Sequence, residues 1–176
     1  EAAAGTTGDD GTFDTGTIEE GRYSVAVSKT GYFGQREVVD LSGDRRVTIS
    51  VQRGTVTLEV NVTDDHFDPP QAVGEATVNV AGSGSVTTQP TGIGRISVPV
   101  NAWATIDVSK DGYETTSEPV YVGELDVQVD LSVQRTPAIS VELLSQRVVI
   151  GERVSLSVTD EYGDPVADAT VRLDGE

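Results

Sequence analysis

The sequence predicts an all-β protein made of tandem antiparallel β-sandwiches. Three observations favour this fold class: composition, apolar alternation and an internal repeat. Hydrophobic residues make up 36% of the 176 residues but aromatic residues only 5%, so the chain can build small cores, mainly of Val and Ile. Runs of the helix-favouring residues Ala, Leu, Glu and Lys are absent. Tight turns between short strands are therefore expected.

Alternation of apolar and polar residues marks the individual strands. It runs through 23–27 and 46–51, and again through 56–62, 104–108 and 125–131. Because successive side chains of a strand point to opposite faces, the apolar members of each segment would line one face of a sheet.

A repeat sets the expected organisation of the chain. The segment VSKTGY at 27–32 recurs 81 residues later as VSKDGY at 108–113, and SVQR at 50–53 recurs 82 residues later at 132–135. Agreement in register at separate places indicates two copies of one unit. In both copies a strand runs into a Lys-x-Gly-Tyr turn, where glycine allows the chain to reverse.

We therefore predict three segments. Residues 1–53 match the C-terminal part of a module, 54–135 form a complete module, and 136–176 match the N-terminal part of another. Because the end segments are complementary halves, three arrangements are open. Neighbouring modules of a longer chain complete them, they pair with each other within the molecule, or they pair head to tail between molecules. We favour the first arrangement for the natural protein.

The complete unit also carries a recognisable set of turn and strand residues. These are GEATVNV at 74–80, Thr87-Thr88 with Gly92, and VSKDGY at 108–113. On these residues the unit resembles the carboxypeptidase regulatory-like (transthyretin-like) and PEGA families of β-sandwich modules. The resemblance implies a spacer, stalk or adhesive element of a cell-surface protein.

The last segment carries a different pattern, VIGE at 149–152 followed by YGDPV at 162–166. On these residues it resembles the start of a bacterial-type Ig-like module. Together the two resemblances imply tandem Ig-like or transthyretin-like sandwiches over most of the chain.

The charge of the chain points to its surroundings. There are 29 acidic and 12 basic residues, for a formal net charge of −17, and only Lys29 and Lys110 among the bases are lysines. Such a surface repels nucleic acid and anionic lipid. It resembles the surfaces of proteins from extreme halophiles, where carboxylates hold hydrated cations. We expect an extracellular, cell-surface protein of haloarchaeal type.

Two kinds of structure are excluded by what the chain lacks. Cysteine is absent, so there is no disulfide and no thiolate chemistry. No run approaches about 18 apolar residues, so direct membrane insertion is not expected.

The chain offers little catalytic chemistry. Its one imidazole, His66, lies in an acidic, proline-containing loop without a nucleophile motif, and we expect a solvated loop residue. We therefore predict a protein that is not an enzyme and has no cofactor. Asp64, Asp65 and Asp68 are a candidate site for Ca²⁺ or another cation, although we favour a hydrated acidic loop.

Three further positions are candidates for modification or binding. Asn61 begins an N-x-T sequon and is a candidate glycosylation site. Trp103, expected to be partly buried, and the repeated Tyr32 and Tyr113 are candidates for a ligand platform, although we interpret the repeated tyrosines as turn-packing residues.

The predicted function is that of structural, spacer or adhesive β-sandwich modules, whose partners are adjacent modules or other surface proteins, with carbohydrate as a candidate ligand. Two alternatives stay open. One is a ligand-binding ectodomain of a membrane-anchored sensor, with binding on loops such as 64–70. The other is a surface filament subunit that exchanges strands between molecules.

Overall fold

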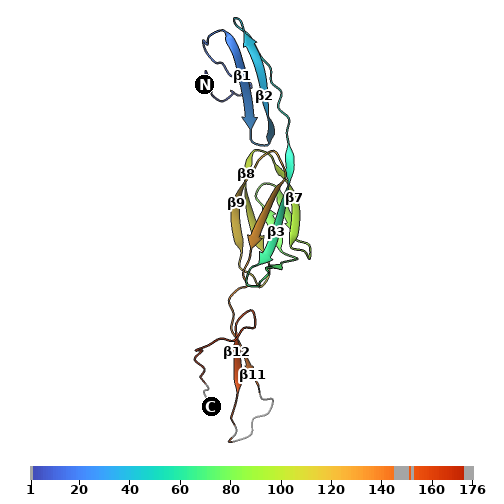
Figure 1. Ribbon diagram of the computed structural model, residues 1–176, viewed down its shortest axis with the longest axis vertical. Coiled ribbons are helices and arrows are strands. Elements are labelled where there is room, and N and C mark those ends of the chain that lie inside the picture. The colour runs from blue at the N-terminus through green and yellow to red at the C-terminus, as the bar shows by residue number, and fades with distance from the viewer. Residues whose placement is uncertain (1, 145–150, 152, 173–176) are drawn as a thin grey trace.

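A computed structural model of the chain describes residues 2–144, 151 and 153–172 (Figure 1). All regular elements in these residues are β-strands, which confirms the prediction of an all-β protein. The strands are β1 (Gly21–Lys29), β2 (Tyr32–Leu41), β3 (Thr55–Asp64), β4 (Gln71–Ala72), β5 (Thr77–Val80), β6 (Gly84–Thr87), β7 (Ile93–Pro99), β8 (Ala102–Ser109), β9 (Thr116–Val122), β10 (Val127–Ser132), β11 (Ser140–Leu143) and β12 (Leu156–Thr159). Within the described residues, no helix exists that is long and apolar enough to cross a membrane.

The middle of the molecule is a β-sandwich of two four-stranded sheets. One sheet has the order β6-β5-β8-β9, with antiparallel neighbours throughout. In the other, β3 pairs in parallel with β10 and antiparallel with both β7 and β4. Residues of β3 that pair with β10 also pair with β7 or with β4. β7 and β4 therefore both lie on the edge of β3 that is opposite β10.

The core of this sandwich follows from the period-2 pattern of its strands. Every second residue of β3 from Leu58 to Asp64 is buried, and Leu58, Val60 and Val62 have no exposed surface. Ile106 of β8 and Val78 of β5 pack from the other sheet in the same buried cluster. Each such side chain contributes about 1.5–3 kcal/mol by leaving water, so a core of small β-branched residues suffices for this module.

A loop folds into one end of the core and depends on Thr88 and Gly92, two of the residues on which the resemblance rests. The buried Thr88 hydroxyl donates to Val73 O (2.8 Å) and accepts from Ala76 N (2.9 Å). Gly92 has φ +79°, and a Cβ there would lie 2.5 Å from Val62 O. The chain therefore passes too close to β3 at this point for any side chain.

The two end segments each contribute a small sheet of their own. β1 pairs with β2, and β11 pairs with β12, both antiparallel. Figure 1 places these sheets at opposite ends of the molecule, with the sandwich between them. The structure therefore does not bring the described residues of 1–53 and of 136–176 together, because each segment lies at a different end of the sandwich. Of the predicted Ig-like motif, Val149, Ile150 and Glu152 lie outside the described residues.

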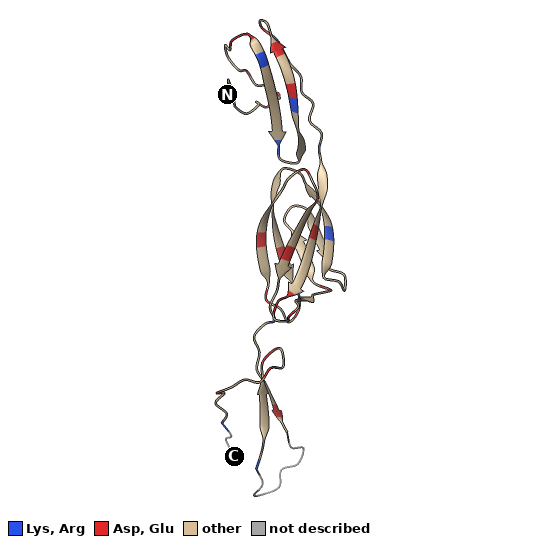
Figure 2. Cartoon of the chain, viewed as in Figure 1, with Lys and Arg blue, Asp and Glu red and all other residues tan. Residues whose placement is uncertain are grey.

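Acidic side chains are spread over all three parts of the molecule. Figure 2 shows Asp and Glu on strands of the sandwich and of both end sheets, and it shows Lys and Arg mainly on the β1–β2 sheet. The acidic groups are therefore spread over the molecule and are not gathered in a single patch.

Candidate functional site

The first joint connects the β1–β2 sheet to the sandwich through the repeated Lys-x-Gly-Tyr turn. Gly31 N donates to Val100 O (2.7 Å), and Gly34 N donates to Glu124 Oε1 (2.6 Å). Both bonds cross from the first segment to the loops at one end of the sandwich. The turn is therefore fixed to the module that follows it, and does not serve as a free linker.

Asn101 lies at the centre of this first joint. Its side-chain amide donates to Tyr32 O (2.9 Å) and to Glu124 Oε1 (2.7 Å). Its backbone has φ +53°, a conformation that Asn tolerates better than most residues. The Asn101 hydrogen bond and then the Gly34 amide lower the pKa of the Glu124 carboxyl from its ordinary value, because both donors favour the charged form.

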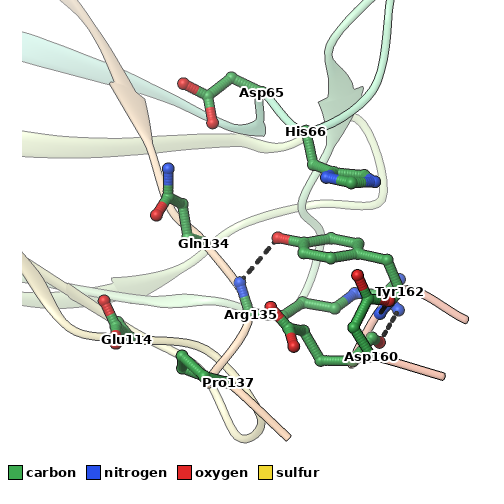
Figure 3. A pocket seen from close by; sticks show the side chains of 9 residues that line it. Asp65, His66, Glu114, Gln134, Arg135, Pro137, Asp160 and Tyr162 are labelled. Carbon is green, nitrogen blue, oxygen red and sulfur yellow. Dashed lines mark hydrogen bonds between the residues drawn. The ribbon is translucent and has the colours of Figure 1, made fainter. Parts of the chain in front are cut away.

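The second joint connects the sandwich to the last segment, and Figure 3 shows its side chains. Arg135 N donates to Tyr162 Oη (2.9 Å), and Arg135 Nη1 donates to Glu161 O (3.0 Å). The Arg135 guanidinium also lies over the Tyr162 ring, 4.8 Å from its centroid. One arginine at the end of the sandwich therefore holds the turn at 160–164 by backbone, side chain and cation–π contacts.

His66 is exposed, as expected for a loop residue, but it also takes part in this joint. Its ring stacks on Tyr162 with centroids 3.6 Å apart and an interplanar angle of 9°. Its Nε2 lies 3.2 Å from Asp164 Oδ2, and Phe67 contacts the same tyrosine edge-on. The loop at 64–70 is thus one wall of the joint.

Asp64 is buried beneath these rings, with 1% exposure. Its Oδ1 accepts from His66 N (3.1 Å) and Tyr162 Oη (3.3 Å). Its Oδ2 has no hydrogen-bond partner among the described residues, but lies 3.9 Å from Arg135 Nε. Desolvation is the main reason that the pKa of Tyr162 is raised from its ordinary value, since burial disfavours the phenolate.

The three aspartates of the candidate cation site have different surroundings. Asp64 is committed to the joint, whereas Asp65 and Asp68 are exposed. Across the part of the chain that the structure describes, no three His, Asp or Glu side chains gather in a way that could hold a metal ion. Beside the joint lies an open cleft of about 410 Å³, lined by Asp65, Glu114, Asp160 and their neighbours.

The two copies of the repeat end in one backbone pattern. In the first, Phe33 N donates to Gln52 O (2.9 Å) and Gly54 N to Gly31 O (3.1 Å). The second repeats both bonds.

At the end of the second copy, Glu114 N donates to Gln134 O (2.8 Å), and Thr136 N donates to Gly112 O (2.9 Å). The β-bridge between Tyr32 and Arg53 likewise recurs between Tyr113 and Arg135. The sequence repeat therefore encodes a repeated exit from a module, as well as repeated strands.

The repeated tyrosines lie in these joints. Lys29 and Arg53 approach the ring of Tyr32 at 5.4 and 5.7 Å, and Lys110 approaches the ring of Tyr113 at 5.7 Å. Arg53 Nε also donates to the Tyr32 hydroxyl (3.1 Å). That hydrogen bond is the largest cause of the lowered pKa of Tyr32, since it favours the phenolate.

The remaining candidates lie on the sandwich. Asn61 is half-buried in β3, and its Nδ2 donates to Asp130 Oδ1 of β10 (3.0 Å). Trp103 is 74% exposed, so the expectation of partial burial was wrong. It lies beside Tyr121 rather than Tyr32 or Tyr113. Sequence reasoning missed Tyr121, whose only signal is its outward place in the alternation of β9.

Comparisons with known proteins do not identify a family for the chain. No protein-family model matches the chain, and no curated protein matches it. Among solved structures, the chain is similar to "The Bacillus anthracis TIE protein", with 16% sequence identity and a TM-score of 0.41. The similarity covers 89% of this chain and 36% of that chain, so the chain spans about a third of the length of its structural neighbour.

Proposed function

We propose that the chain is a non-catalytic spacer from an extracellular surface protein, in which β-sandwich modules are joined end to end at fixed joints. The observation that carries the proposal is that hydrogen bonds cross the joint at both ends of the sandwich. Gly31 N donates to Val100 O in the first joint, and Arg135 donates to Tyr162 Oη and Glu161 O in the second. A flexible linker would lack such contacts. A stalk that must hold its outer parts at a set distance does need such joints.

Further support comes from a side chain that is already engaged in contacts within the joint. His66 is stacked on Tyr162 and faces Asp164, so its imidazole belongs to the joint. This favours a structural role for the loop at 64–70 over the ligand-binding role of the sensor alternative. A screen with ester, peptide and glycoside substrates that detected turnover lost in His66→Ala would contradict the non-catalytic part of the proposal.

The finer identity of the modules is part of the same proposal. We propose transthyretin-like and Ig-like modules of a halophilic surface protein, supported by the residues that carry those resemblances and by the net charge of −17. Solution scattering of the chain in molar KCl should give an elongated particle. A compact particle would count against a spacer.

The fixed second joint can be tested directly, because the chain contains no cysteine. Ser85 and Ala167 are exposed on either side of it, so S85C and A167C would carry two spin labels. Double electron–electron resonance in molar KCl should give one narrow distance distribution. Tyr162→Ala should broaden it strongly.

Tyr23→Ala serves as the matched control, since the Tyr23 hydroxyl donates to Glu19 O within the first segment and bonds to no other described residue. The control should leave the distribution unchanged. A distribution in the unsubstituted chain as broad as that of Tyr162→Ala would refute a fixed joint.

A further inference from the structure

An exposed aromatic pair lies on the outer face of the sandwich. Trp103 on β8 is 74% exposed and Tyr121 on β9 is 50% exposed. The two residues are directly opposite in the antiparallel register. Their ring centroids are 5.5 Å apart and the rings are inclined by 59°.

The register directs both rings to solvent. On either side of Trp103 the strand turns a residue inward, and Ala104, Ile106 and Val108 are buried in the core. Trp103 thus belongs to the outward set, and a shift by one residue would bury it at the cost of the core. Large aromatic groups that remain exposed on a well-packed sheet are typical of binding surfaces.

The ring of Tyr121 is also held in place. Its hydroxyl donates to Asn101 Oδ1 (3.3 Å), and the Asn101 amide is itself fixed by Tyr32 O and Glu124 Oε1. A ring fixed from behind loses little conformational freedom when a ligand contacts it. The first joint thus serves as the support for the aromatic pair.

The rest of this face is flat, polar and without basic groups. Asp107, two residues after Thr105 on β8, accepts a hydrogen bond from the Ser117 hydroxyl (2.6 Å). None of the residues that share the outward face is Lys or Arg: they are Thr77, Asn79, Ser85, Thr87, Thr105, Asp107, Ser109, Ser117 and Pro119.

From these observations we propose that Trp103 and Tyr121 form a binding platform for a neutral saccharide. The faces of the two rings suit the C–H faces of pyranose units, and the adjacent hydroxyl, amide and carboxylate groups suit the sugar hydroxyls. Phosphate, sulfate and uronate ligands would meet a chain of charge −17 with no base on this face.

A cationic ligand fits the geometry less well. Cation recognition by aromatic groups uses rings that enclose the charge, whereas these two rings lie open at the edge pair β8–β9. On the outward face of β8 the carboxylate is that of Asp107, which is four residues from Trp103 and accepts a hydrogen bond from Ser117. The face therefore favours an uncharged, flat ligand.

The test uses the full chain in molar KCl and the fluorescence of Trp103, which is the only tryptophan. The probes are the neutral oligosaccharides cellohexaose, mannohexaose and chitohexaose, with dextran sulfate and choline as charged probes. At least one neutral probe should shift the emission in a saturable way, and neither charged probe should do so.

Variants then assign the site. By isothermal titration calorimetry, Trp103→Ala and Tyr121→Ala should each weaken binding by at least about tenfold, which is about 1.4 kcal/mol. Their melting temperatures should stay close to that of the parent, because both side chains are exposed. Phe13→Ala removes an exposed aromatic group of the first segment (44% exposed) and should change nothing.

Four results would overturn the proposal. The first is no response to the three neutral probes, and the second is calorimetric binding that Trp103→Ala leaves intact. The third is binding of dextran sulfate or choline instead, and the fourth is self-association of the chain that Trp103→Ala abolishes. The last result would show that the face is an interface between copies. None of the four would bear on the spacer proposal, which depends on the joints.

Discussion

Gly92 allows a direct test of how closely the loop at 88–92 approaches β3. Gly92 and Gly82 have the same φ of +79°. A Cβ at Gly92 would lie 2.5 Å from Val62 O, whereas among the described residues a Cβ at Gly82 meets no atom within 4 Å. Alanine substitutions at the two positions therefore carry the same backbone strain but differ in steric overlap.

The expected magnitudes follow from these two terms. A left-handed conformation costs alanine about 1–2 kcal/mol, and the loss of unfolded-state freedom offsets about 0.4–1 kcal/mol. Gly82→Ala should thus lower the free energy of unfolding by about 0–1.6 kcal/mol. At Gly92 the overlap with backbone adds about 1–3 kcal/mol, for a total of about 1–4.6 kcal/mol.

The measurement is urea-induced unfolding followed by circular dichroism at one fixed concentration of KCl. Gly92→Ala should be less stable than Gly82→Ala by about 2 kcal/mol, which is about 8–16 °C in melting temperature for a module of this size. Equal stabilities within about 0.5 kcal/mol would refute the close approach to Val62.

Three more outcomes are expected. Thr88→Val should lower the free energy of unfolding by about 2–3 kcal/mol in the same assay, because two buried backbone groups lose their partner. Substitution of the exposed neighbour, Thr87→Val, should lower it by less than about 0.5 kcal/mol. Similar losses at both positions would contradict the role of Thr88. Tyrosine titration followed by NMR should place Tyr32 below and Tyr162 above the ordinary pKa, with Arg53→Gln moving only Tyr32 upward. Because the pKa of Tyr162 is raised, its contribution to the stability of the joint is complete below the ordinary tyrosine pKa and is lost as pH rises through the raised pKa. A joint that loosened as the pH fell through that range would contradict this expectation. Because the chain carries a charge of −17, raising KCl from low to molar concentration should raise the melting temperature by at least about 5 °C, or about 1 kcal/mol, and a constant melting temperature would exclude self-repulsion as a factor.

Much of the sandwich was predictable because its strands carry their own signal. Alternation over 56–62 and 104–108 corresponds to β3 and β8, whose inward residues fill the core. The same signal failed at 46–51, which is equivalent by the repeat to β10 but forms no strand. The reason is that β10 pairs with β3, and the described part of the first segment provides no strand equivalent to β3. Alternation determines which residues share one face of a strand, but the strand forms only where a neighbouring strand is present to pair with it.

The contacts at the second joint lay beyond sequence reasoning. His66 and Tyr162 are far apart in the chain, and nothing in an acidic, proline-containing loop indicates that its histidine will stack on a tyrosine of the next segment. By contrast, Arg135 carried a weak signal, since it repeats Arg53. The repeat was interpreted as strands and turns, and its last residue proved to belong to the joint.

The parallel pairing of β3 with β10 has a mechanical consequence. The chain enters the sandwich at the start of β3 and leaves it at the end of β10, and these strands run side by side in the same direction over six residue pairs. A pull on the two ends of the chain therefore slides one strand along the other and loads their hydrogen bonds together, in shear, instead of opening them one at a time. Single-molecule stretching should show the sandwich yielding abruptly at high force, and Val129→Pro, which removes a backbone N–H in this strand, should lower that force. A gradual, low-force extension of the unsubstituted chain would show that the pair does not bear the load.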